Sequence, residues 1–479
     1  MRFVVGALLA AVSVAVAGGA RAAPLDEPFV GGLGFTGPSS PSVASIYWNP
    51  AAMGAAPGTQ VMISGVVRTA STSVTRADGT SAVGSELVQP ANWPIGPGAF
   101  MGISSDLGGD RFTIGFATYM PYQQRVKYDL SAPPGAEPTR YQALEVDLRN
   151  LALVPALSIR FLDDLRLGIA PGFMFSTGRL VFDEDTALDG LRTDCGGMPC
   201  GTEDPAAAGR VAVDSGHGLG DAKFSLTLGG GIYYRRRGLE IGVAYTSRPI
   251  GGDVAGVEVA GARTTVTPPP SAGMSPSCAA SRCVFGDLQY RLPDVWMAGV
   301  TWHLRSGLEL TAIARWLWFH VHDRIDVRLT GPGLEAANMP EHIVLYRGFR
   351  DVWDLRGRVA YWWHEKVRLG AQLRIETSAV AASAVNAAAI DGLKAQPMAM
   401  VQVRLARHFW LDAAYGVTLM GAVTTGKSAF DPALATSCNA SGGDLGACSG
   451  RRAGLARPSA TGTYGRLTQD FGLTFTAKF

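Results

Sequence analysis

Arginines occupy the polar positions of several short segments in which polar and apolar residues alternate. A guanidinium donates a planar fork of hydrogen bonds that matches a carboxylate, so an arginine in an apolar enclosure could bind a carboxylated small molecule. Buried arginines are also commonly neutralised by Asp or Glu, and for any single residue that structural role is the commoner one. The candidates for carboxylate binding are Arg160, Arg315, Arg358, Arg374 and Arg404.

The 6 cysteines form three local pairs, each inside a stretch rich in Gly, Ser, Pro or Ala. In an exported chain, cysteines this close together favour small loops clasped by disulfides. A metal site is the alternative, but no histidine accompanies any pair at ligand spacing. Six cysteines allow many pairings, so the connectivity stays open. The disulfide candidates are Cys195 with Cys200, Cys278 with Cys283, and Cys438 with Cys448.

The sequence carries no catalytic motif that names a nucleophile. It has no G-x-S-x-G, and none of its 7 histidines has a context that indicates a Ser or Asp partner. His320 and His322 could share a strand face, but without a third metal ligand they fit better beside Trp318 at a membrane interface. We therefore expect no catalytic residues, no cofactor and no resident metal. A lipid hydrolase whose groups converge from distant segments, and a purely structural protein, stay open as alternatives.

The N-terminus has the features of a secretory signal peptide. Arg2 supplies a positive charge, and an apolar run extends from Val4 to Ala17 before an A-x-A cleavage site that ends at Ala22. The run is too short to span a bilayer as a helix. Residues 1–22 are therefore predicted to be a signal peptide and are excluded from the prediction of the fold.

Composition and net charge narrow the class of protein. Gly accounts for 60 of 479 residues and charged residues for only 17%, and a net charge of +2 gives no reason to expect a nucleic-acid partner. The rest of the chain has no apolar run of roughly 18 residues, which argues against membrane-spanning helices. If the chain crosses a membrane, it must therefore do so with β-strands.

Alternation of polar and apolar residues predicts such strands. At the C-terminus, Phe471, Leu473, Phe475 and Phe479 alternate with polar or small residues, which is typical of a strand with one lipid-facing side. Similar alternation occurs at 155–170, 308–318 and 367–376, with aromatic residues near segment ends as in an interfacial girdle. Short turns alternate with long connections near 183–220, 264–285 and 426–460, as periplasmic turns alternate with extracellular loops. The sequence therefore predicts an all-β fold, a transmembrane antiparallel barrel in a Gram-negative outer membrane.

The segment 23–58 does not alternate and carries clusters of Gly, Pro and Ser. A segment of this kind before a barrel either hangs in the periplasm or folds into the lumen as a plug. We expect three parts: a signal peptide at 1–22, a plug at 23–58 and a barrel at 59–479.

One stretch is more specific than the strands. Residues 45–53 (SIYWNPAAM), followed by Gly58-Thr59-Gln60 and a strand, resemble the N-terminal signature of the outer-membrane transporters for long-chain fatty acids and other hydrophobic compounds (FadL/TodX/OMPP1 type). The stretches 154–160, 292–294 and 462–464 look like the same family. The resemblance covers essentially the whole mature chain, and the Asn-Pro-Ala element is its most specific part.

The resemblance implies a barrel of about fourteen strands with a hatch in its lumen. It also implies passive uptake without a cofactor: a hydrophobic compound enters from outside, binds in the barrel and leaves sideways into the outer membrane. Long-chain fatty acids are the expected cargo and aromatic hydrocarbons the alternative. Outer-membrane lipid and the barrel assembly machinery are expected partners of a monomeric chain. In the hatch, we expect Asn49, Pro50 and Ala51 to pin the plug, because the Asn side chain can bond backbone groups left open at Pro50.

Overall fold

The structure is a computed structural model of the chain. It describes residues 25–26, 28–77, 79–87, 99–185, 205–216, 222–251, 256–267, 284–304, 307–334, 341–426, 428 and 460–479. The predicted signal peptide, residues 1–22, lies outside these residues. So do the predicted disulfide pairs, Cys195 with Cys200, Cys278 with Cys283, and Cys438 with Cys448.

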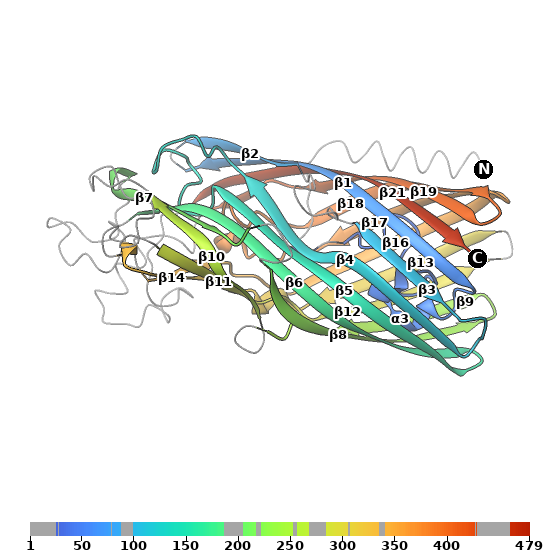
Figure 1. The fold of residues 1–479 in the computed structure, drawn as a ribbon. Helices are drawn as coiled ribbons and strands as arrows, with labels where there is room; N and C mark the ends of the chain where they lie inside the picture. The colour runs from blue at the N-terminus through green and yellow to red at the C-terminus, as the bar shows by residue number, and fades with distance from the viewer. Residues whose placement is uncertain are drawn as a thin grey trace.

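The described chain forms a closed antiparallel barrel whose wall has 14 strands (Figure 1). The first wall strand, β1, pairs with β3 on one side and with β21 on the other, which closes the sheet. In order around the wall, the strands are β1 (Thr59–Arg76), β3 (Phe100–Ser105), β4 (Phe112–Lys127), β5 (Glu145–Leu162), β6 (Leu165–Asp185), β8 (Lys223–Arg236), β9 (Leu239–Thr246), β12 (Val295–His303), β13 (Leu308–Leu317), β16 (Val352–His364), β17 (Val367–Glu376), β18 (Lys394–Ala406), β19 (Phe409–Met420) and β21 (Gly462–Lys478). The predicted all-β barrel of about fourteen strands is confirmed.

Side chains alternate between the two faces of the wall as the sequence predicts. In β17, Leu369, Leu373 and Ile375 are 40%, 47% and 45% exposed on the outer face, whereas Arg374 and Glu376 point inward and are buried. An apolar outer face and a polar inner face are what a barrel in lipid requires. Strand pairing then satisfies the backbone hydrogen bonds that lipid cannot satisfy.

A row of aromatic residues crosses four neighbouring wall strands. Trp316 in β13 pairs with Trp296 in β12 and with Trp353 in β16, and Trp296 pairs in turn with Tyr245 in β9. The rings of Trp316 and Trp353 stack with centroids 5.3 Å apart. Amphipathic aromatic rings in such a row are typical of the membrane–water interface.

The two ends of the barrel differ. Short turns join β3 to β4, β5 to β6, β8 to β9, β12 to β13, β16 to β17 and β18 to β19, all at the end where Phe479 N donates to Thr59 O at 2.8 Å. The long connections lie at the other end, which we call the outer end because long loops face outward in such barrels (Figure 1). They carry β2 (Ser81–Leu87), β7 (Ala208–Asp214), β10 (Val257–Thr267), β11 (Val284–Tyr290), β14 (Arg324–Thr330), β15 (His342–Tyr346) and β20 (Val423–Thr425), with the 3-10 helices η2 (Pro205–Ala207), η5 (Phe319–Val321) and η6 (Ala382–Ala384). No helix among the described residues is long and apolar enough to cross a bilayer.

Candidate functional site

The described residues from 25 to 58, which we call the N-terminal segment, run through the interior of the barrel (Figure 1). The segment contains two short helices, α2 (Ser45–Trp48) and α3 (Pro50–Met53), which pack against β4, β5, β6 and β8. Most of its side chains are buried, and the indole of Trp48 donates to Val30 O at 2.9 Å. The segment therefore packs closely against the inner face of these strands.

Asn49 links the N-terminal segment to itself and to the wall. Its side-chain oxygen accepts a hydrogen bond from Ala51 N at 3.1 Å, which caps α3. Its amide nitrogen donates to Pro38 O and to Ile232 O, each at 3.0 Å. An Asn side chain can both donate and accept hydrogen bonds. This single residue therefore ties together three pieces of backbone, at Ala51, Pro38 and Ile232.

Glycines on the inner face of the wall make room for the N-terminal segment. A Cβ atom at Gly231 would overlap Asn49 Oδ1, one at Gly242 would overlap Pro38 O, and one at Gly168 would overlap Ala51 N. The same close approach to this segment recurs at Gly115, Gly299, Gly370 and Gly472. At Gly168 and Gly242 the contact is between backbone atoms, an approach that a side chain on the wall would prevent. We call these inward-facing glycines the glycine seat. Glycine at an inward position of a predicted strand was a signal in the sequence that could have located it.

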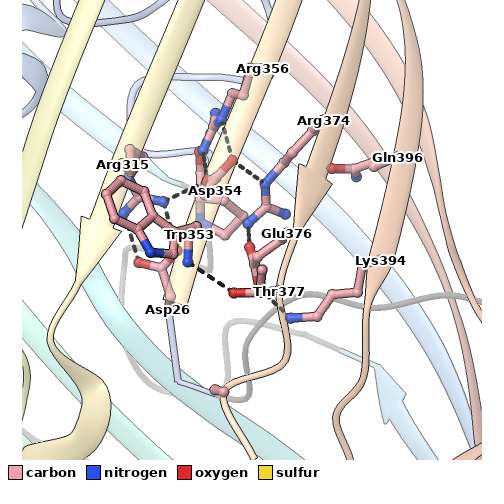
Figure 2. A network of polar contacts seen from close by, with 12 residues as sticks. Asp26, Arg315, Trp353, Asp354, Arg356, Arg374, Glu376, Thr377, Lys394 and Gln396 are labelled. Atoms are coloured by element: carbon pink, nitrogen blue, oxygen red, sulfur yellow. Dashed lines mark hydrogen bonds and ion pairs between the residues drawn. The ribbon is translucent and has the colours of Figure 1, made fainter. Parts of the chain in front are cut away.

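Buried ion pairs connect the start of the N-terminal segment to the wall near the outer end (Figure 2). Arg315 in β13 binds Asp26 through both of its Nη atoms, at 2.8 Å each, and Asp354 in β16 at 3.0 Å. Asp354 also accepts a hydrogen bond from Arg356 at 2.6 Å and forms an ion pair with Arg374 at 3.0 Å. A single buried carboxylate thus receives three guanidinium groups.

The same network continues along the next two strands. Arg374 and Lys394 both bind Glu376, and Lys394 Nζ lies 2.9 Å from Asp391 Oδ1. Ligand atoms of Asp26, Asp354 and Glu376 lie within 4.8 Å of one another, a spacing that a metal ion could use. The cluster contains the four carboxylates of Asp26, Asp354, Glu376 and Asp391 and the four cations Arg315, Arg356, Arg374 and Lys394. Since these charges already balance, the cluster has no excess negative charge to attract a metal ion.

The predicted carboxylate-binding arginines fall into different environments. Arg315 and Arg374 are buried in the ion network and bind carboxylates of the protein. Arg160 and Arg404 lie beside short turns at the opposite end of the barrel, where Arg160 pairs with the exposed Asp110 at 2.6 Å and Arg404 donates to a backbone carbonyl. The two pairs therefore lie at opposite ends of the barrel, and the four arginines do not form one site.

Arg358 differs from Arg160, Arg315 and Arg374 because its partners among the described residues are neutral, and it differs from Arg404 because it is buried. It is buried in β16 and donates to Thr36 O at 2.9 Å, to Ser40 Oγ at 3.1 Å and to Thr311 Oγ1 at 3.2 Å. Among the described residues, no carboxylate lies within ion-pair distance of it. It contacts the middle of the N-terminal segment from the wall.

Arg347, which no sequence pattern indicated, is another buried cation of the interior, like Arg358. It is 2% exposed and donates to Gln124 Oε1 and to Ala388 O, while its guanidinium lies 5.1 Å from the ring centroid of Phe349. Within the described ranges it has no carboxylate partner, and burial lowers the pKa of Arg347 to about 9. Arg347 follows β15 in a connection between wall strands, and nothing in the local pattern marks that connection as folding inward.

His322 is also buried near the outer end, so the prediction that it lies at a membrane interface is wrong. Its Nδ1 contacts Arg291 O at 2.7 Å, and its ring packs 4.7 Å from that of Phe349. Burial and, secondarily, the charge of Arg347 lower the pKa of His322 to about 3. The imidazole is therefore neutral. His320 is exposed and contacts Asp351 at 2.6 Å.

Comparison with known proteins identifies the class of this barrel. The family model for outer membrane protein transport proteins (OMPP1/FadL/TodX) matches residues 9–391. No curated protein matches the sequence. Among solved structures, a Pseudomonas aeruginosa FadL homologue is similar at 15% identity, covering 97% of this chain and 100% of that chain with a TM-score of 0.66. The Ralstonia pickettii toluene transporter TbuX is similar at 14% identity (96% and 98% covered, TM-score 0.59), and the Pseudomonas putida toluene transporter TodX at 13% (92% and 96%, TM-score 0.62).

The barrel is therefore a transport protein of the outer membrane. More specifically, the chain belongs to the OMPP1/FadL/TodX family of outer membrane transport proteins. Members of this family are channels for hydrophobic compounds and are not enzymes, which sets aside the hydrolase alternative. The family resemblance and the outer-membrane location predicted from the sequence are confirmed.

Proposed function

We propose that this channel carries long-chain fatty acids, or other hydrophobic compounds that end in a carboxylate, passively across the outer membrane and releases them sideways into the bilayer. The observation that carries the proposal is Arg347, a buried cation whose hydrogen-bond partners among the described residues are the neutral oxygens of Gln124 and Ala388. A buried charge is normally paired, and leaving it without an anion is costly. The carboxylate of a cargo molecule would supply the missing charge.

The surroundings of Arg347 suit an amphipathic cargo. Phe319, Phe349 and Tyr290 belong to the same apolar cluster of the interior, so an alkyl chain could lie against them while its carboxylate meets the guanidinium. Each methylene that leaves water contributes about 0.8 kcal/mol, which gives a long chain sufficient affinity without further polar contacts. Arg358 is a second carboxylate position on the same grounds, deeper in the barrel and beside the N-terminal segment.

Two features support the rest of the route. As the hatch, the N-terminal segment would be pinned by Asn49, Pro50 and Ala51 against β8 and would keep the barrel from being an open pore. Sideways release is supported by a discontinuity in the wall, because β1 pairs with β3 at 59–64 and with β2 at 69–75. Strand β4 also shifts register next to Pro121, which lacks the N–H that a regular ladder needs.

The test compares three cargoes in cells and in liposomes that contain the purified protein: a radiolabelled long-chain fatty acid, the alcohol of equal chain length, and toluene. Arg347→Gln keeps hydrogen-bonding groups but removes the charge. Since a charged hydrogen bond contributes about 1.5–3 kcal/mol, we expect fatty acid uptake to fall roughly 10- to 100-fold at low concentration. Uptake of the alcohol and of toluene should change less than about twofold.

Arg347→Lys and Arg236→Gln are the matched controls. Lysine keeps the charge and should retain part of the fatty acid uptake, and Arg236 is an exposed arginine at the short-turn end whose loss should have no effect. Toluene uptake without fatty acid uptake by the native protein would favour an aromatic cargo, as in the toluene transporters of similar fold. Equal fatty acid uptake by the native protein and Arg347→Gln would exclude Arg347 from cargo binding.

A further inference from the structure

The connection between β17 and β18, residues 377–393, folds into the barrel although both strands end at the outer end. Residues 384–392 are all buried, and the chain has no charged side chain between Glu376 and Asp391. We call Ala379–Asp391 the strap. Its buried apolar side chains belong to the main apolar cluster of the interior and are Ala379, Val380, Ala384, Val385, Ala387, Ala388, Ala389 and Ile390. Connections normally run over the surface, so an inward connection of this composition needs an explanation.

The strap reaches a wall strand that is not its neighbour. Tyr128, next to β4, donates its hydroxyl to Ala387 O at 3.0 Å, and Gln124 in β4 donates its amide to Ala388 O. In the wall, β19, β21, β1 and β3 lie between β18 and β4. The contacts therefore cross the lumen. They lie on the outer side of the hydrogen bond that Gln123 N donates to Leu25 O.

A third group of contacts holds the strap to the segment before β16. Arg350 N donates to Ala379 O at 2.6 Å, Phe349 and Val380 form an isolated β-bridge, and Arg347 donates to Ala388 O. These contacts are mostly hydrogen bonds to backbone carbonyls, each with a net contribution of about 1 kcal/mol, and packing of small side chains. Such a set can hold a closed position and still be broken without unfolding the wall.

The two ends of the strap are tied together at its base. Asp391 accepts from Ala379 N at 2.5 Å, and its other oxygen lies 2.9 Å from Lys394 Nζ. Lys394 also binds Glu376, so the base is part of the buried ion network (Figure 2). A loop of roughly a dozen residues with joined ends is an Ω-loop, which can move as one unit about its base.

We infer that the strap is a gate across the outer entrance of the lumen, which separates from Phe349, Gln124 and Tyr128 when it opens and must open before cargo reaches the N-terminal segment. Closed, it fills the entrance with small side chains and covers Arg347 and Gln124. Open, it uncovers these polar groups and the apolar residues around them. Because the strap stands in the way of any molecule entering from outside, the gate acts on apolar and carboxylated cargo alike and does not depend on the proposed fatty acid specificity.

A disulfide that locks the strap tests the gate. Phe349→Cys together with Val380→Cys places cysteines at the isolated bridge, where Cα atoms of antiparallel partners lie about 4.5–5.5 Å apart, within reach of a disulfide. The folded protein is reconstituted in liposomes and oxidised, and uptake of a long-chain fatty acid and of toluene is measured before and after reduction with dithiothreitol. For each cargo that the native protein carries, we expect oxidation to reduce uptake by this variant at least about tenfold relative to the same variant kept reduced, and we expect dithiothreitol to restore that reduced level.

Two controls separate the lock from side effects. Ala298→Cys with Ala314→Cys cross-links paired residues of β12 and β13 in the wall and should leave uptake unchanged, and the native chain passes through the same cycle to account for its own 6 cysteines. Unchanged uptake by the locked protein, loss of one cargo only, or loss that reduction does not reverse would each overturn the gate.

A second readout does not depend on cargo. In an Ala388→Cys variant of the protein, labelling by a membrane-impermeant maleimide reports strap opening, and we expect the Phe349–Val380 lock to slow it at least about tenfold. Equal labelling of locked and unlocked protein would overturn the gate. If the native protein carried no fatty acid while the lock still blocked toluene and slowed labelling, the proposed cargo would fail and the gate would stand.

Discussion

The carboxylate of Asp26 accepts two hydrogen bonds from Arg315, one from each Nη atom and each 2.8 Å long. Arg315 is fully buried, and its Nη2 also donates to Tyr47 Oη in α2 at 3.0 Å while its Nη1 donates to Asp354 in β16. One guanidinium therefore joins the start of the N-terminal segment, its first helix and two strands of the wall. Residues that are 289 positions apart in the sequence are held together by this contact.

The first prediction is that Asp26→Asn releases the start of the N-terminal segment. Removing the charge of one partner of a buried ion pair typically costs about 3–5 kcal/mol, and the remaining carboxylate, Asp354, is already shared with Arg356 and Arg374. In planar bilayers we expect Asp26→Asn to open transiently at least about ten times more often than the native channel. Asp129→Asn, which changes an exposed turn, is the control and should behave as native. Native conductance of Asp26→Asn would show that this ion pair does not hold the segment closed.

The second prediction concerns the glycine seat. Gly231→Ala places a methyl group against the side chain of Asn49, so either α3 or β8 must move, and overpacking of this kind costs about 1–3 kcal/mol. We expect cells that carry Gly231→Ala to become more permeable to large antibiotics that the native barrel excludes. Gly65→Ala in β1 is the matched control, because its added Cβ meets nothing within 4 Å. Equal antibiotic sensitivity of the two variants would contradict the seat.

The wall was predictable because lipid outside and polar groups inside impose a strict period of two. The faces of Leu373, Arg374 and Ile375 follow from that period alone, and the structure confirms them. The connections follow no such period. The burial of Arg347 and of the strap depends on which loop folds inward, and the local sequence does not indicate this. The pairing of Asp26 with Arg315 likewise arises only after the barrel closes, since no local spacing relates two residues so far apart.

The third prediction distinguishes two roles of Asn49. If Asn49 only capped α3, then Asn49→Asp would be nearly neutral, since Asp and Asn are equally good caps. The structure predicts the opposite, because the amide nitrogen donates to two carbonyls, Pro38 O and Ile232 O, which a carboxylate would repel. We expect Asn49→Asp to lower thermal stability of the folded barrel at least as much as Asn49→Ala, which loses the cap and leaves both carbonyls unpaired at about 1–3 kcal/mol each. Melting temperatures in detergent would check this order. A native melting temperature for Asn49→Asp would show that Asn49 acts only as the cap of α3.

The fourth prediction is a loss of stability at the outer entrance as the pH falls, caused by His322. Its pKa in the folded protein is about 3, compared with 6.5 for an ordinary imidazole, because it is buried and faces the charge of Arg347. Between these two values the unfolded state binds a proton that the folded state does not. The stabilisation is therefore complete above pH 6.5 and decreases as the pH falls towards 3, by up to about 1.4 kcal/mol per pH unit.

Hydrogen exchange of the backbone amides at 343–349, corrected for the intrinsic effect of pH, would measure this loss between pH 7.5 and 5. His322→Phe removes the titrating group but keeps a ring against Phe349, so its protection should depend much less on pH than that of the native protein. His320→Gln changes an exposed histidine two positions away and should retain the native pH dependence. His322→Phe cannot bind a proton at this position. If it nevertheless lost protection as steeply as the native chain when the pH falls, protonation of the buried imidazole would not be the cause.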